Sequence, residues 1–182
     1  MPRPRNIKII LLLLILGSIE FAHLTAPVPH YAAIFCERGL TAQSKGQINQ
    51  AVADYQKAIF HNPFDPESYY RIGLLYQKQG DEQKALKNFY KVVELGEKKI
   101  YAPAYLTVGM DYLKQGQQTK ALACFQELQL PEAIFYRGVI YYNLGQKDLA
   151  YQQMKILHYM VSIDGIWKKK LGELLYMTYP PR

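Results

Sequence analysis

Pairs of glycines at a constant spacing constrain the fold of this chain more than any other feature. In each of four pairs the two glycines are seven residues apart: Gly39 and Gly46, Gly73 and Gly80, Gly109 and Gly116, and Gly138 and Gly145. An alanine follows each pair five residues later, at Ala51, Ala85, Ala121 and Ala150. Gly46 and Gly80 are 34 residues apart. A period of this length predicts stacked copies of one supersecondary unit.

Large residues accompany these small ones at fixed positions. Rings precede the first glycine by four residues in three copies, at Phe35, Tyr69 and Tyr105, and other rings follow the alanine by four, at Tyr55, Phe89 and Phe125. Small residues let two antiparallel helices approach closely, and rings fill the space around them. We therefore expect each copy to be a helical hairpin, with the second glycine at the turn. Sixteen tyrosines suit such a fold, because a buried ring can keep its hydroxyl bonded.

This pattern resembles the tetratricopeptide-repeat (TPR) family over about 130 of the 182 residues. The resemblance implies an all-α TPR solenoid that binds polypeptides and is not an enzyme, with repeats at 32–65, 66–99, 102–130 and 131–161. Arg38 and Ala42 depart from the usual Leu and Tyr of the first repeat, and the second helix of the third ends early, before Pro131. Ile134 and Arg137 mark the fourth repeat as degenerate and terminal.

In this family the first helix of each repeat lines a concave groove, so that the ligand-facing positions carry over by register. The resemblance implies a protein-binding groove formed by Tyr70, Leu74, Gln77, Leu106, Met110, Leu113, Phe135, Val139 and Tyr142. This set is apolar and aromatic, which favours an amphipathic helix or an extended apolar segment as the ligand. Cys36 and Leu40 stand where relatives that bind chaperone tails carry Lys and Asn, so a carboxylate clamp is not expected. Alternatively, neighbouring repeats cover some of these side chains.

The region after the repeats reads as a capping helix over 162–178, followed by a tail at 179–182. Asp164 is the expected N-cap, and the apolar stripe that would close the last repeat consists of Ile166, Trp167, Leu171, Leu174 and Leu175. Lys168, Lys169 and Lys170 would then be solvated. A basic patch that contacts acidic lipid or protein is the alternative.

The first residues have the profile of an export signal, with a basic stretch at 1–8 and an apolar segment at 9–26. Small residues suited to cleavage are poorly placed near Ala22 and Ala26, so we expect an uncleaved single-pass signal anchor. The uncharged run is about 11 residues, or about 17 Å of helix, which is short for a membrane core of about 30 Å. Residues 27–31 would be a linker. Basic residues before the anchor place the N-terminus in the cytoplasm and the repeats outside it.

Charge and chemistry exclude several classes of function. Of the net charge of +7, residues 1–31 and 162–182 carry +2 each, which leaves +3 for the repeats and no long basic stripe for nucleic acid. The four histidines have no metal-ligand spacing, and no phosphate loop or catalytic triad is present. Cys36 and Cys124 lie two repeats apart and are interpreted as buried thiols. We therefore predict no cofactor, no metal and no small-molecule substrate.

Three hypotheses remain for the function. The first is a membrane-anchored scaffold, adaptor or assembly factor whose partner is a peptide, a helix or a subunit of a membrane complex. The second is a permanent structural subunit of a large membrane protein complex. The third is a secreted soluble TPR protein, which requires cleavage of the N-terminal segment.

Overall fold

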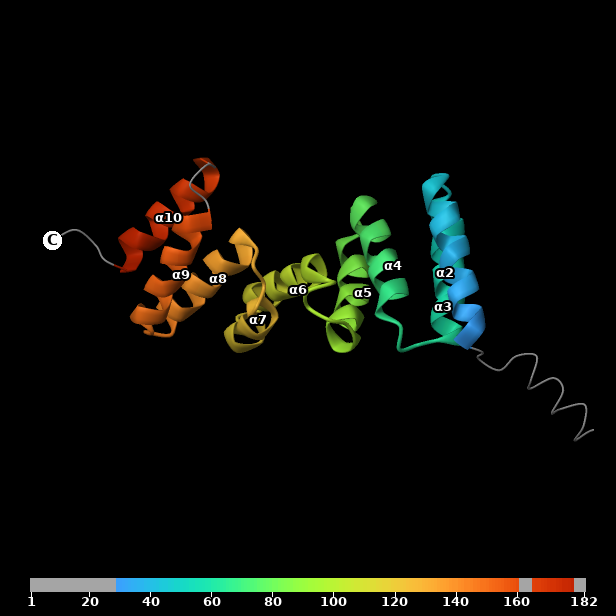
Figure 1. The fold of residues 1–182 in the computed structure, drawn as a ribbon, viewed down its shortest axis with the longest axis horizontal. Coiled ribbons are helices and arrows are strands. Elements are labelled where there is room, and N and C mark those ends of the chain that lie inside the picture. The colour runs from blue at the N-terminus through green and yellow to red at the C-terminus, as the bar shows by residue number, and fades with distance from the viewer. Residues whose placement is uncertain (1–28, 161–164, 179–182) are drawn as a thin grey trace, which may run out of the picture. The chain divides into compact units, whose positions relative to one another are not determined.

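The computed structural model describes residues 29–160 and 165–178, and all of their regular structure is helical (Figure 1). The chain divides into two compact units, residues 1–64 and 65–182. The predicted anchor at 9–26, Asp164 and the tail at 179–182 lie outside the described residues. None of the helices in the described ranges has the length and apolar content needed to cross a membrane.

The described residues of the first unit form one hairpin, made of α2 (Pro29–Ser44) and α3 (Ile48–His61). Its core holds small residues around one ring: Ala32, Ala42, Ala51, Tyr55 and Ala58. Residues 29–31, which the sequence assigns to the linker, are helical and belong to α2.

Within its described residues, the second unit contains three hairpins and one more helix. In chain order these are α4 (Pro66–Lys78) with α5 (Glu82–Leu95), α6 (Ala102–Lys114) with α7 (Gln118–Phe125), and α8 (Pro131–Asn143) with α9 (Lys147–Met160), followed by α10 (Gly165–Thr178). One apolar cluster runs from Ala85 to Ile140, and a second joins α8, α9 and α10 through Ile134, Met154 and Leu174.

The second glycine of each pair makes the turn of its hairpin, as predicted. The backbone φ angles are +72°, +78°, +73° and +74° at Gly46, Gly80, Gly116 and Gly145. At Gly80 this left-handed conformation lets its N–H bond to the Gln77 carbonyl at 3.1 Å, while the Asp81 N–H bonds to the Tyr76 carbonyl at 3.0 Å. The pair forms a Schellman motif, which satisfies carbonyl groups at the end of α4.

The first glycine of each pair admits a ring from the partner helix in the first three repeats. A Cβ atom at Gly39 would lie 2.6 Å from the Tyr55 ring, and one at Gly73 would lie 2.5 Å from the Phe89 ring. Gly109 and Phe125 have the same relation. The predicted close approach of two helices at these positions is therefore confirmed.

The fourth repeat fills its core differently, which fits its degenerate sequence. Met154 takes the place of the ring, and a Cβ atom at Gly138 would meet Leu174 of α10, with its Cδ2 at 2.7 Å. Leu174 is 1% exposed, so it is a core residue of this repeat. The last helix thus supplies the side chain that the repeat lacks.

The second helix of the third repeat, α7, ends at Phe125, earlier than Pro131 indicates. Its end is bound by Arg137 of α8, whose Nη1 donates to the carbonyl oxygens of Phe125 at 3.1 Å and Leu128 at 3.4 Å. Arg137 is 8% exposed, and burial lowers the pKa of its guanidinium. Arg137 therefore supplies hydrogen-bond donors of the kind that the N–H groups of a further turn of α7 would provide.

The expected stripe on the last helix is only partly buried. Leu171 and Leu174 are buried, but Ile166 and Leu175 are 67% and 39% exposed. Lys170, expected to be solvated, lies over the Phe135 ring with its Nζ 5.3 Å from the ring centroid. The helix thus covers α8 and α9 along a narrower stripe than the sequence indicates, and it leaves apolar side chains outside.

Candidate peptide-binding surface

The predicted groove residues lie on the first helices α4, α6 and α8, and none of them is fully buried. Gln77 is exposed, and the other eight are partly buried. Five of these pack against the cluster that joins the second and third repeats: Tyr70, Leu74, Leu106, Met110 and Leu113. Phe135 and Val139 pack against the cluster at α10. Tyr142 is also partly buried. The predicted surface is therefore partly accessible, and its residues also support the core.

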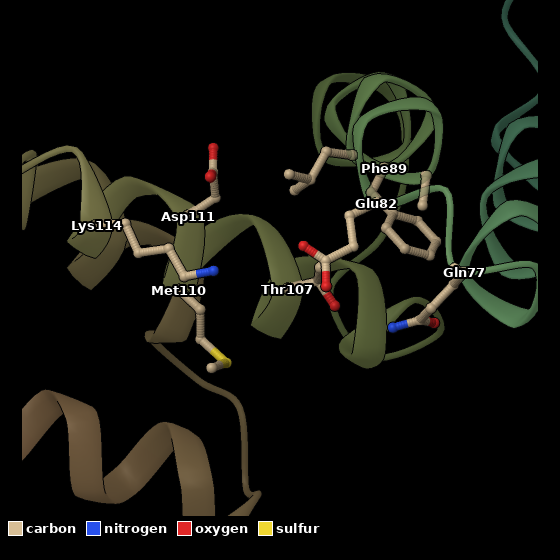
Figure 2. Close-up of a pocket in the computed structure, with 10 residues that line it drawn as sticks. Gln77, Glu82, Phe89, Thr107, Met110, Asp111 and Lys114 are labelled. Carbon is tan, nitrogen blue, oxygen red and sulfur yellow. The ribbon is translucent and has the colours of Figure 1, made fainter.

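A hollow of about 280 Å³ lies between the α4–α5 hairpin and α6 (Figure 2). Its apolar wall comes from Ala85, Leu86 and Phe89 of α5 and Met110 of α6. The polar lining residues are Gln77, Glu82, Thr107, Asp111 and Lys114, and Figure 2 shows the Glu82 side chain extending from α5 toward Thr107. The hollow therefore combines an apolar surface with both hydrogen-bond donors and hydrogen-bond acceptors.

Only Gln77 and Met110 of the nine predicted groove residues line this hollow. Sequence reasoning missed Glu82 and Leu86, because it drew all ligand positions from first helices whereas α5 is a second helix. It also missed Thr107 and Asp111, which share a face of α6 with Met110 and Lys114. The spacing 107, 110, 111 and 114 is the signal that identifies this face.

Asp111 is held in a fixed position at the rim of the hollow. Its Oδ2 accepts hydrogen bonds from the Tyr90 hydroxyl at 2.7 Å and from Gln115 Nε2 at 2.6 Å. Burial, and then the hydrogen bond to Asp111, raise the pKa of Tyr90 to about 12. Tyr90 therefore remains a neutral donor at physiological pH and keeps Asp111 oriented.

Tyr70 belongs to a structural cluster outside the hollow. Its ring packs edge-on against Tyr101 with the centroids 5.1 Å apart, and the Tyr101 hydroxyl donates to Glu67 Oε2 at 3.2 Å. The other oxygen of Glu67 pairs with Arg71 Nε at 2.6 Å. Burial and the nearby Glu67 raise the pKa of Tyr101 to about 12. Replacing Tyr70 would therefore disturb packing as well as any ligand contact.

The two cysteines differ in their surroundings. Cys124 is buried at 4% exposure, and this burial raises the pKa of its thiol. Cys36 is only partly buried, so the interpretation of both as buried thiols was wrong for Cys36. Among the described residues, no group of three or more His, Cys, Asp or Glu side chains could hold a metal ion.

Family models match most of the helical region. A model described as "TPR repeat" covers residues 43–80, and two described as "Tetratricopeptide repeat" cover 65–128 and 132–158. Human Superkiller complex protein 3 is 40% identical over 65 residues, which are 36% of this chain and only 4% of that protein. The chain thus spans about 4% of the length of the curated relatives it matches.

Solved structures show the same fold at low sequence identity. The crystal structure of MamA protein aligns with a TM-score of 0.60 at 19% identity, covering 81% of this chain and 82% of that one. YrrB, described as a TPR protein with an unusual peptide-binding site, also aligns at 0.60, with 22% identity and coverage of 78% and 74%.

Together, the repeated hairpins, the turn glycines and the glycine–ring contacts define a helical-repeat protein of the class that acts as a scaffold for protein–protein interactions. The matched family models together span more than half of the chain. The chain belongs to the tetratricopeptide-repeat family.

Proposed function

We propose that this protein is a membrane-anchored scaffold that binds an apolar or amphipathic polypeptide segment at the hollow between α4–α5 and α6. The observation that carries the proposal is the composition of that hollow. The apolar wall includes Met110, Leu86 and Phe89. Hydrogen-bond donors and acceptors come from the polar lining residues Gln77, Asp111 and Lys114. Apolar anchors with a few placed polar groups are what a bound peptide segment requires.

The volume of the hollow fits one or two large side chains and not a whole peptide. About 280 Å³ is at the lower end of the range for ligand pockets. The partner would therefore insert an anchor residue there, and the rest of its segment would lie along the partly exposed Leu106 and Leu113. This mode of binding needs no catalytic group, and the protein acts as a scaffold and not as an enzyme.

Site-specific photo-cross-linking tests this proposal in the full chain. A photoreactive residue at Gln77, which is exposed in the hollow, should capture a partner in membranes, and one at Gln56, exposed on α3, serves as the matched control. Met110→Ala should lower capture from position 77 about tenfold, because it removes an anchor contact. Phe64→Ala, at a side chain that is 76% exposed and outside the hollow, should leave it unchanged. Equal capture from both positions, unaffected by Met110→Ala, would contradict the proposal.

The anchor at 9–26 and the extracytoplasmic location of the repeats are parts of the same proposal. The mass of the mature chain tests the anchor: an intact N-terminus supports it, whereas a chain that begins near Ala22 or Ala26 would show a secreted soluble protein. Gentle solubilisation separates a scaffold from a permanent subunit. A scaffold should elute partly at its own mass, and a permanent subunit always within a larger assembly.

A further inference from the structure

Arg38 of α2 and Arg137 of α8 occupy the same position in their repeats, directly before the first glycine of the pair. Each contacts the residue sixteen positions later. Arg38 Nη2 lies 3.3 Å from Asp54 Oδ1, and Arg137 Nε donates to Gln153 Oε1 at 3.0 Å. The first and fourth repeats therefore share an arginine that is oriented by a polar side chain of the second helix.

In the fourth repeat this arginine binds the end of a preceding helix. Its Nη1 donates to carbonyl groups at the end of α7, and the face of α8 around it is covered. Ala133 and Ile140, on that face, are both 0% exposed. The third repeat has a similar contact, because the Tyr105 hydroxyl of α6 donates to the carbonyl oxygens of Val93 and Gly96 at the end of α5. The first helix of a repeat thus receives the carboxyl end of another helix.

The corresponding face of α2 is open among the described residues. Ile34 is 40% exposed, where its equivalent Ala133 is fully covered, and the Arg38 side chain is 55% exposed. A hollow of about 470 Å³ lies on this face, and its lining is mostly polar: Ile34, Glu37, Arg38, Thr41, Ala42, Lys45, Gln47, Gln50 and Asp54. In the part of the chain that the structure describes, the face therefore offers an exposed arginine to a helix end.

Asp54 shows that this face is built around the arginine. Its side chain is 3% exposed, and Oδ2 accepts a hydrogen bond from Gln50 Nε2 at 3.0 Å. Oδ1 has only the ion pair with Arg38 among the described residues. A buried carboxylate is costly without a cation, so Asp54 holds one edge of the guanidinium inward. The other N–H groups of the guanidinium remain able to donate outward.

The last two helices present exposed apolar side chains beside a helix end. Tyr159, Leu175 and Tyr176 are 82%, 39% and 66% exposed, and a hollow of about 330 Å³ lies between α9 and α10. The last four carbonyl groups of a helix have no partner within it, so α10 ends in acceptors for an arginine. Apolar surface that no described residue covers favours the stacking of another helical unit.

We propose that the α2 face around Arg38 binds the α9–α10 end of a second copy of this chain, with Arg38 donating to main-chain carbonyl groups at the carboxyl end of α10. The contact joins two different surfaces, so it is heterologous and adds copies head to tail. It does not involve the hollow at Met110. Self-association and partner capture can therefore fail independently.

Disulfide trapping between two forms of the full chain tests the contact. One form carries Thr41→Cys on the α2 face, and the other carries Tyr176→Cys in the last turns of α10. Mixed and oxidised, they should give a heterodimer disulfide well above the yield of either form alone and above the background from the native cysteines. A dominant Thr41→Cys homodimer, or no product above that background, overturns the proposal.

Sedimentation of the full chain provides the second measurement. Ile34→Glu should weaken self-association at least about tenfold, because it places a charge in the contact. Phe64→Glu, at a residue 76% exposed and outside the hollow, is the matched control and should have no effect. Arg38→Ala should also weaken it, while Lys87→Ala removes the same charge elsewhere without effect. A native chain that stays monomeric over the whole concentration range, or an Ile34→Glu variant that associates as strongly as the native chain, would overturn the proposal.

Discussion

The third repeat, α6–α7, and the fourth, α8–α9, have the same spacing of small residues but complete their cores in different ways. Gly109 receives the ring of Phe125 from its own hairpin, whereas Gly138 receives Leu174 from α10. The difference follows from one position, because Met154 stands where the third repeat has its ring. A single change from aromatic to aliphatic thus makes a repeat dependent on the helix that follows it.

The dependence also runs in the other direction. Arg137 of the fourth repeat donates to carbonyl groups at and after the end of the short helix α7. The third repeat therefore depends on its neighbour for this helix cap, although the ring in its core comes from its own hairpin. The α5 end is bound in a similar way by the Tyr105 hydroxyl. Within the second unit, adjacent repeats therefore complete each other, as expected for a solenoid in which neighbours bury each other.

Leu174→Ala should have the largest effect on the fourth repeat. It removes a side chain that is 1% exposed and leaves a cavity against Gly138, so we expect a loss of about 3 kcal/mol in the free energy of unfolding. Leu175→Ala, one residue later and 39% exposed, should cost less than about 1 kcal/mol. Urea denaturation of both variants measures the difference. Equal losses would show that α10 does not complete the repeat.

Adding one methyl group to each repeat distinguishes the two cores. Gly109→Ala should destabilise by about 2 kcal/mol, because the new Cβ overlaps a ring enclosed by the core. Gly138→Ala meets the end of the flexible Leu174 side chain, so the gain in helix propensity of about 1 kcal/mol should offset most of the strain. Thermal unfolding followed by circular dichroism gives both values. A Gly138→Ala variant less stable than Gly109→Ala would reverse the comparison.

The two helix-end caps should differ in strength. Arg137→Met keeps an apolar stem but leaves carbonyl groups without their buried donor, and we expect a loss of about 2 kcal/mol. Tyr105→Phe removes only a neutral hydroxyl and should cost about 1 kcal/mol. Hydrogen exchange at the last turns of α7 and α5 would locate the losses. If the exchange changes were global and equal, neither residue would act as a local cap.

A smaller effect is expected from pH. The folded-state pKa of Tyr90 and of Tyr101 is raised from 10.0 to about 12, so the neutral form is favoured on folding. This contribution is fully present below pH 10 and is lost as pH rises toward 12. The double variant Tyr90→Phe and Tyr101→Phe should therefore lose less stability than the native chain between pH 10 and 12. Parallel slopes in thermal melts would contradict the assignment.

The sequence was informative wherever a contact stays within one repeat. The turn at Gly80 and the pairing of Gly73 with Phe89 follow from local spacing, because both partners belong to a single hairpin. Arg137 was recognised as a departure, but its function depends on where α7 ends, and a buried cation with carbonyl partners has no sequence pattern. The partner of Gly138 lies 36 residues away in α10. No periodicity connects such a pair.

The binding surface was predicted less well, for a related reason. The predicted groove positions were all taken from the first helices of the repeats. Of these predicted residues, Met110 and Gln77 also line the hollow. Glu82 and Leu86 enter from α5, so the hollow is a property of two adjacent repeats. The side chains that line it could be predicted only once the packing of α5 on α6 was known.

The contribution of Leu174 also sets an order for folding during synthesis. In repeats one to three the ring that packs on the first glycine is already present when the hairpin leaves the ribosome, because it belongs to the same hairpin. The fourth hairpin, α8–α9, is complete in sequence at Met160 but must wait until Leu174 has been added. For that interval the nascent chain carries an unfilled apolar site at Gly138, which is where a chaperone would be expected to bind.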